Sequence, residues 1–250
     1  MNTFLIIITI IYGIIIGSFL NVCIYRIPKN ESIVTDRSHC MTCGHKLKWY
    51  DLVPLVSYLT LGGKCRYCKT KISKQYPVIE FTNGVLYGIL VVVNGFNIST
   101  ILFCLCSSAL LALSVIDWRT FEIPIAFNIF IGILGIIRLL TDLEHWYVYI
   151  IGFFAVSGFL YLLFLITKGR GIGGGDIKLM AAAGLLIGWK NIILALGIGC
   201  VLGSIIHIIL MKAQNKERVL AFGPYLSLGI YIAMLYGNQI IEWYINTFIY

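Results

Sequence analysis

Residues 146–176, WYVYIIGFFAVSGFLYLLFLITKGRGIGGGD, join an apolar stretch to a glycine-rich one. The first part, 146–167, carries no charge and is long enough to cross a bilayer as a helix, which takes about 20 apolar residues. Two basic residues and then three consecutive glycines lead to Asp176. An ionisable group so close to a membrane span suggests a functional site at the membrane boundary.

The rest of the chain extends this membrane pattern. Of its 250 residues, 59% are hydrophobic and only 12% are charged, whereas about a quarter are charged in an ordinary soluble domain. We therefore predict an all-α polytopic membrane protein with about eight transmembrane helices. The first is a retained helix, because no basic segment or cleavage site marks a signal peptide. The predicted spans are 3–25, 78–97, 99–116, 123–141, 146–167, 177–188, 191–211 and 221–246.

The sixth of these spans is unusually short. Twelve residues reach only about 18 Å as a helix, which is less than the hydrocarbon core of a bilayer. This helix would have to tilt, or extend past Trp189 and Lys190 before the chain turns.

The distribution of charge predicts the orientation. Residues 26–78 hold ten of the 19 Lys and Arg residues against three acids, Glu31, Asp36 and Asp51. With the N-terminus outside, the same side receives Arg119, Lys168, Arg170, Lys178, Lys212, Lys216 and Arg218. Only Arg138 and Lys190 remain on the other side, as the positive-inside rule requires of a cytoplasmic loop. We expect a first helix (1–25), a cytoplasmic loop domain (26–77) and a transmembrane domain (78–250).

Two CxxC pairs stand in the cytoplasmic loop: Cys40 with Cys43, and Cys65 with Cys68. Four thiolates from two such turns suit one tetrahedral zinc ion, and a closed four-cysteine site holds a fold without doing chemistry. Disulfides are the alternative, but cytosolic thiols stay reduced. His39 and His45 flank the first pair and are expected to be solvated neighbours. The basic loop is expected to meet lipid head groups and not nucleic acid.

The other four cysteines lie inside predicted spans, where small, buried and inert thiols are expected. They are Cys23, Cys104, Cys106 and Cys200.

Two aspartates fall at the predicted cytoplasmic boundary. Asp117 ends the third span and Asp176 opens the sixth. Each alone has a plain structural explanation, as a solvated residue past a helix end for Asp117 or as an N-cap for Asp176. Together they indicate a carboxylate pair that shares one proton, in which one member activates water and the other polarises a scissile carbonyl.

The glycines before Asp176 fit this chemistry. Gly173, Gly174 and Gly175 lack a Cβ, so they would let an extended substrate backbone approach and could adopt torsions closed to other residues. A phosphate-binding loop is the competing explanation, but GIGGGD lacks the Lys-Ser/Thr ending of such a loop.

Several motifs together resemble the bacterial type 4 prepilin peptidases, which belong to the GxGD group of intramembrane aspartyl proteases. GSFLNVCIYRIP (17–28), the two CxxC pairs with the residues around them, GGGDIKLMAAAG and FGPYLSLG (222–229) carry this resemblance. One departure is Ile125, where many relatives have an aspartate after the proline.

The resemblance implies a bifunctional enzyme of the bacterial inner membrane. Such enzymes remove the basic leader of a prepilin or pseudopilin after a glycine on the cytoplasmic side, with Asp117 and Asp176 as the catalytic pair. Many members then methylate the new N-terminus with S-adenosylmethionine, whose binding residues the sequence does not indicate. The pilin could serve a type IV pilus, protein secretion or competence, and no oligomeric state follows.

Two other functions are compatible with part of the sequence. A transporter could couple ions through the two aspartates, but it should place them near mid-bilayer and often shows internal repeats, which are absent here. A membrane-anchored zinc-ribbon adaptor would use only residues 26–78. Neither explains the glycines and the second aspartate together.

Overall fold

The computed structural model describes residues 3–35, 37–169, 171–214 and 220–248. Asp36, Arg170, Lys216 and Arg218, which enter the charge argument, lie outside these ranges. In the described ranges the regular structure is helical, apart from two isolated bridges. The order is α1 (Thr3–Arg26), η1 (Ile27–Lys29), η2 (Trp49–Asp51), α2 (Val56–Thr60), α3 (Gln75–Asn94), α4 (Ile98–Thr120), α5 (Ile125–Thr141), η3 (Leu143–His145), α6 (Trp146–Ile166), α7 (Gly174–Ile187), α8 (Trp189–Gln214) and α9 (Gly223–Phe248).

Each of the eight predicted spans corresponds to one helix, α1 or one of α3–α9. Among the described residues, five helices are long and apolar enough to cross a membrane, namely α1, α3, α4, α6 and α8. Helix α5 has 17 residues and α7 has 14. The all-α membrane class is confirmed, and the number of eight spans stays a prediction.

Two compact units make up the chain, Met1–Ala112 and Leu113–Tyr250. Helix α4 begins in the first unit and ends in the second. The division into 1–25, 26–77 and 78–250 stays a prediction.

In the first unit, α1 packs against α3 through small residues. A Cβ on Gly13 would lie 2.9 Å from the Gly84 Cα, so the two backbones are in close contact. The buried Asn83 amide donates to the Gly13 carbonyl at 2.7 Å and accepts from the Ser108 hydroxyl at 2.9 Å. These bonds satisfy polar groups that lipid could not, and they connect α1, α3 and α4.

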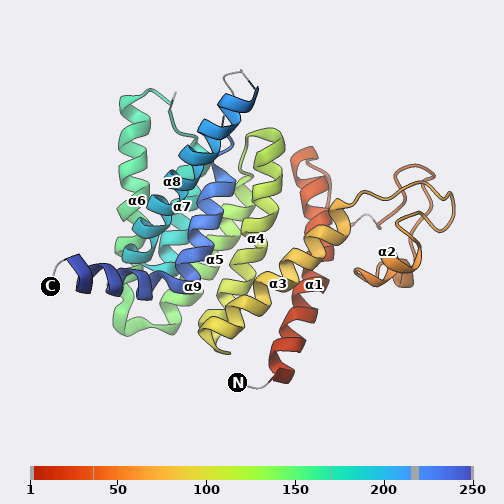
Figure 1. Cartoon of the computed structure of the whole chain (residues 1–250), viewed down its shortest axis with the longest axis horizontal. Coiled ribbons are helices and arrows are strands. Elements are labelled where there is room, and N and C mark those ends of the chain that lie inside the picture. The colour runs from red at the N-terminus through yellow and green to blue at the C-terminus, as the bar shows by residue number, and fades with distance from the viewer. Residues whose placement is uncertain (1–2, 36, 170, 215–219, 249–250) are drawn as a thin grey trace. The chain divides into compact units, whose positions relative to one another are not determined.

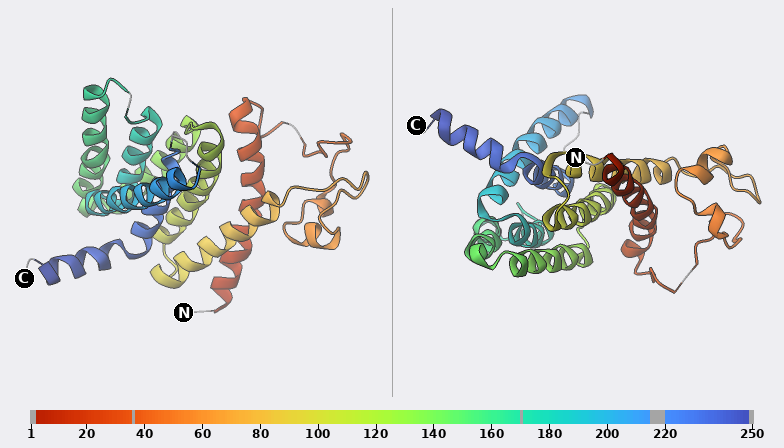
Figure 2. Two further views of the ribbon diagram at one scale, coloured as in Figure 1. Left: turned by 45° about the horizontal axis from the view of Figure 1, so that its top comes forward. Right: turned by 90° about the horizontal axis from the view of Figure 1, so that it is seen from below.

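The second unit is built around the short helix α7, which contacts α5, α6, α8 and α9 (Figures 1 and 2). A Cβ on Gly184 would overlap the Gly152 carbonyl of α6, so these two helices touch through their backbones. From Leu179 to Ile187 all residues except Ala181 are buried. A helix enclosed by others needs no membrane-spanning length, which accounts for the short apolar run in the sequence.

Helix α7 ends at Ile187, and Gly188 terminates it with φ +81°. Helix α8 then begins at Trp189. The suggested extension of the sixth helix past Trp189 and Lys190 is therefore wrong, because Gly188, with φ +81° and ψ +167°, leaves the helical region and ends α7.

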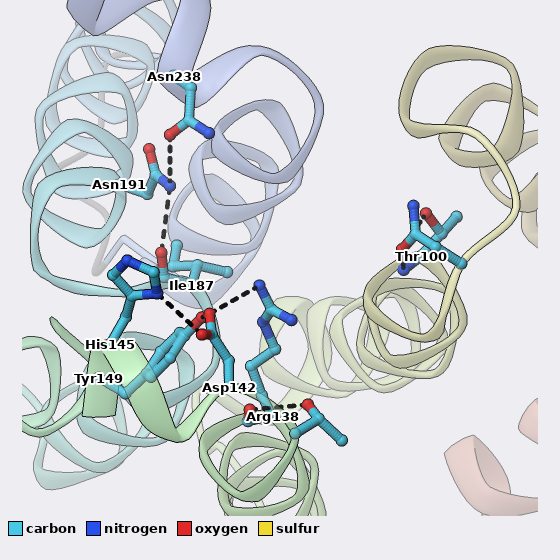
Figure 3. A network of polar contacts seen from close by, with 10 residues as sticks. Thr100, Arg138, Asp142, His145, Tyr149, Ile187, Asn191 and Asn238 are labelled. Carbon is cyan, nitrogen blue, oxygen red and sulfur yellow. Dashed lines mark hydrogen bonds and ion pairs between the residues drawn. The ribbon is translucent and has the colours of Figure 1, made fainter. Parts of the chain in front are cut away.

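A polar cluster closes the turn between α5 and α6 (Figure 3). The Asp142 carboxylate accepts hydrogen bonds from Tyr149 Oη (2.6 Å) and His145 Nδ1 (2.9 Å) and pairs with Arg138 at 3.6 Å. The bonds from Tyr149 and His145 hold the pKa of Asp142 below its usual value. His145 thus has a structural partner.

Burial of the cysteines in the helices is as predicted in three cases. Cys23, Cys104 and Cys106 are buried, but Cys200 on α8 is exposed. The prediction for Cys200 is wrong because its position on α8 faces away from the neighbouring helices.

Candidate functional site

Two turns with one hydrogen-bond pattern carry the cysteines of the loop. Cys40 N–H donates to the His45 carbonyl at 2.9 Å, and Gly44 N–H donates back to the Cys40 carbonyl at 2.8 Å. The second turn repeats this pattern, with Cys65 N–H donating to the Thr70 carbonyl at 2.8 Å. Gly44 has φ +68°, which explains the glycine after the first pair.

The four sulfur atoms from these turns meet at one point. The Sγ atoms of Cys40, Cys43, Cys65 and Cys68 lie within 4.8 Å of one another, and Cys40 and Cys68 are 3.7 Å apart. A tetrahedron with Zn–S bonds of about 2.3 Å has edges of about 3.8 Å. All eight cysteines are free thiols. The donor set and its spacing therefore fit zinc.

Two of the four thiols have a lowered pKa, which favours the binding of a cation. Hydrogen bonds with Thr70 lower the pKa of Cys68 to about 6, and backbone N–H groups of Cys43 and Thr42 lower the pKa of Cys40. A backbone hydrogen bond also lowers the pKa of Cys43, but burial and the neighbouring thiols outweigh it and raise that pKa to about 11. Two cysteines thus favour the thiolate that metals bind, and a metal would displace the remaining protons.

Asp117 lies in the last turn of α4 and not beyond a helix end, because the helix continues to Thr120. It is only 4% exposed, and one carboxylate oxygen, Oδ2, accepts the Gly223 backbone N–H at 2.9 Å. A Cβ on Gly223 would stand 2.7 Å from that oxygen. Gly223 opens α9, so the first residue of α9 holds a carboxylate of α4 across 106 residues of sequence.

Asp176 occupies the third position of α7, after the N-cap Gly173. It is not itself the N-cap; its carboxylate reaches back to the Gly173 backbone N–H, as acidic side chains do at this helix position. The Ile123 side chain lies against both Gly175, next to Asp176, and Gly223, which binds Asp117. The two predicted residues therefore lie in the same part of the second unit, and their action as a pair stays a prediction.

The three glycines before Asp176 differ in their surroundings. A Cβ on Gly173 would lie 3.1 Å from the Asp176 carboxylate, and one on Gly175 would lie 3.0 Å from the Ile123 side chain. Around Gly174, apart from its chain neighbours and its own helix backbone, no atom of the described residues lies within 4 Å of that position. None of the three has a positive φ, so the expected unusual torsions are absent. The lack of a Cβ permits close packing at Gly173 and Gly175 and leaves open space beside Gly174.

Three residues beside the aspartates were not singled out from the sequence. Ile123 lies against both Gly175 and Gly223. Asn128, on the first turn of α5, directs its amide N–H to the Gly175 carbonyl at 3.5 Å, and its buried Oδ1 has no partner within the described chain. Only Gly223 could have been found from the sequence, because it belongs to the FGPYLSLG motif. No motif or spacing pointed to Ile123 or Asn128.

Comparisons with known proteins agree along the chain. Residues 11–94 match the model of the bacterial peptidase A24 N-terminal domain, and residues 104–208 match that of the type IV leader peptidase family. The prepilin leader peptidase/N-methyltransferase of Pseudomonas aeruginosa is 32% identical over 95% of this chain and 92% of its own. The protein of that name from Bacillus subtilis is 34% identical over 94% of this chain and 96% of its own. No solved structure matches.

Proposed function

This chain belongs to the type IV leader peptidase family, and we propose that it removes the leader of a type IV prepilin or pseudopilin with Asp117 and Asp176 as its catalytic pair. The observation that carries this proposal is that the Ile123 side chain lies against both Gly175, which precedes Asp176 at the start of α7, and Gly223, whose N–H binds the Asp117 carboxylate at the end of α4. Relatives named as prepilin leader peptidases match over nearly the whole chain.

The pair can hydrolyse a peptide bond without a metal. An ionised aspartate takes a proton from water as the oxygen attacks the scissile carbonyl, and the protonated aspartate donates to the carbonyl oxygen. When the C–N bond breaks, the leaving nitrogen receives a proton, which leaves a carboxylate on the leader and an amine on the pilin. We assign no fixed role to either aspartate; the Gly223 N–H holds Oδ2 of Asp117 in place.

Gly174 is the part of this site where a substrate backbone can come near. The space beside its Cα is open, whereas Gly173 and Gly175 are packed against other atoms. An extended segment of the prepilin would lie here, next to Asp176. This gives the glycines the role that the sequence suggested, at one position of the three.

Cleavage takes place at the cytoplasmic face in this proposal, after a glycine. The excess of Lys and Arg in residues 26–78 favours a cytoplasmic position for the loop, in a bacterial inner membrane. A prepilin with a basic leader in the cytosol and an apolar helix in the bilayer presents its cleavage site at that boundary.

The names of the relatives add methylation of the new N-terminus, and the class of donor is S-adenosylmethionine. This donor would transfer a methyl group to the pilin amine. A cavity of about 260 Å³ in the first unit does not fit it, because the cavity is lined by residues such as Leu5, Ile8, Tyr87 and Val91 and by no charged side chain. We therefore derive no step through the donor.

Zinc at Cys40, Cys43, Cys65 and Cys68 has a structural role in this proposal. Four thiolate ligands leave no open coordination position for a substrate. The ion would hold the two turns of the loop together and take no part in hydrolysis.

The two alternatives have less support. For a transporter, both aspartates would be expected in the middle of helices, but they lie at helix ends. An adaptor would make no use of the contact between Asp117 and Gly223. The relatives that match over the whole length are named as enzymes.

Mass spectrometry of a pseudopilin incubated with the purified protein tests the proposal. We expect loss of a leader after a glycine, no loss with Asp117→Asn or Asp176→Asn, and an added methyl mass only when S-adenosylmethionine is present. Unchanged substrates across several pilins would contradict the proposal, and uptake into proteoliposomes would then test the transporter.

A further inference from the structure

An apolar strip runs along the cysteine-containing loop, from Trp49 to Leu59. Trp49 is 79% exposed, Leu59 75% and Val56 56%. Tyr50, Leu52 and Val53 of the same segment are exposed as well. Six exposed apolar side chains within eleven residues suggest an interaction site, because exposed apolar surface on a protein outside the bilayer often marks one.

The strip shows no free charge. Its one ionisable acid or base, Asp51, has a side chain only 3% exposed, paired with Arg66 at 2.7 Å. The Lys48 backbone N–H also bonds to it, at 3.3 Å. On both sides of the strip in sequence, by contrast, the lysines are exposed, among them Lys46, Lys48, Lys64, Lys69 and Lys71. The strip is therefore an apolar segment flanked by basic residues of the same loop.

A hydrogen bond places the middle of the strip beside α3, one of the candidate membrane helices. The Leu55 N–H donates to Oε2 of Glu80 at 2.8 Å, and Glu80 is buried in α3. Glu80 comes five residues after Gln75, the first residue of α3, which is about 8 Å along a helix. Because α3 is one of the five candidate spans, the middle of the strip lies beside the second turn of a membrane helix.

The backbone of the strip is strained at the same point. Leu55 has φ +60° and ψ −51°, and the Val56 N–H donates to the Pro54 carbonyl at 2.6 Å. This is the rare form of the γ-turn, which a side-chain-bearing residue adopts only when its surroundings impose it. The hydrogen bond from the Leu55 N–H to Glu80 forms at this turn and restrains the middle of the strip.

We propose that the segment Trp49–Leu59 sits in the lipid surface and anchors the cysteine-containing loop there. Its apolar side chains would enter the boundary between head groups and acyl chains, roughly 5–10 Å deep. The surrounding lysines would meet anionic head groups. Lipid is favoured over a basic prepilin leader because the exposed charges around the strip are positive and would repel it.

Quenching of Trp49 fluorescence by lipid tests the anchor. The full-length protein is placed in nanodiscs of phosphatidylglycerol brominated near the head-group end of the chains, and its emission is compared with that of Trp49→Phe to isolate Trp49. We expect loss of most of the Trp49 emission and little quenching by aqueous iodide. Leu59→Asp should restore much of the emission.

Val34→Asp is the matched control, because Val34 is also apolar, 85% exposed and in the same loop, but outside the strip. It should leave the quenching unchanged. The zinc content of both variants shows whether the loop is still folded. Trp49 emission that iodide quenches and brominated lipid does not would overturn the proposal, as would shielding that appears only when a prepilin is added.

Discussion

The cysteine cluster and the aspartate pair are assembled over very different distances in sequence. Each cysteine turn closes on itself through backbone bonds five residues apart, such as Cys40 to His45. The Asp117 carboxylate is held by Gly223, 106 residues later. A site made of local turns needs only a metal to join its halves, whereas the aspartate site requires α4, α7 and α9 to pack correctly first.

Loss of either aspartate should have the largest effect on cleavage. Asp117→Asn or Asp176→Asn keeps the side-chain shape and removes the acid–base group, so we expect the cleavage rate to fall by about 10²–10⁴-fold or more. Initial rates of cleavage of one prepilin by each variant measure this fall. Asp142→Asn, a carboxylate at the other end of α5, should cleave normally; a similar fall for Asp142→Asn would point to folding and not to chemistry.

Substitution of Gly223, which lies against Asp117, should have the next largest effect on the cleavage rate. The added Cβ of Gly223→Ala would stand 2.7 Å from Asp117 Oδ2, and a displacement near 1 Å can cost on the order of 10²-fold in rate. The matched variant is Gly197→Ala on α8, where no atom of the described residues beyond the local helix backbone lies within 4 Å of the added carbon. Equal rates for the two variants would show that Gly223 does not position Asp117.

Access of the substrate should depend on Gly174. Among the described residues, no atom beyond the local backbone lies within 4 Å of the methyl of Gly174→Ala, so the fold should be kept while an approaching peptide is obstructed. We expect KM to rise more than kcat falls. Steady-state kinetics on a soluble prepilin peptide would measure both; an unchanged KM would remove the open side of Gly174 from the substrate path.

The cysteines should affect the loop far more than the catalytic step. In Cys40→Ser with Cys65→Ser, each turn loses a ligand, so we expect zinc to be lost and the loop to become sensitive to protease. Metal analysis and limited proteolysis measure these changes. Cys200→Ser is the control and should keep the zinc; an unmodified protein that contains no zinc would refute the assignment.

The smallest effect should come from Asp51. Burial works to raise its pKa, but the bonds from Arg66 and Lys48 outweigh it and hold the pKa below the usual value. The stability that this carboxylate contributes is present above its ordinary pKa and is lost as the pH falls through the lowered one. Asp51→Asn should therefore flatten the acid limb of the loop's unfolding curve, followed by hydrogen exchange. An unaltered acid limb would show that the pair with Arg66 contributes nothing.

Predictions made from short sequence patterns agreed best with the structure. The eight apolar runs became helices and the two CxxC pairs met, because hydrophobic length and turn chemistry act within a few residues. The sequence also identified Asp117 and Asp176 as candidate site residues, because they are carboxylates beside apolar helices. It went wrong at Cys200, since exposure on α8 depends on which face its neighbours cover, and at Trp189, where Gly188 ends the helix.

The amino-acid sequence by itself determined the helical membrane class, the cysteine cluster and the two aspartates, because each depends on composition or short spacing. Only the tertiary structure decided that Gly223 holds Asp117, that Asn128 reaches Gly175 and that Glu80 fixes Leu55. Each of these contacts joins residues 25 or more positions apart. No periodicity in the chain records such a contact, since it exists only once the helices have packed.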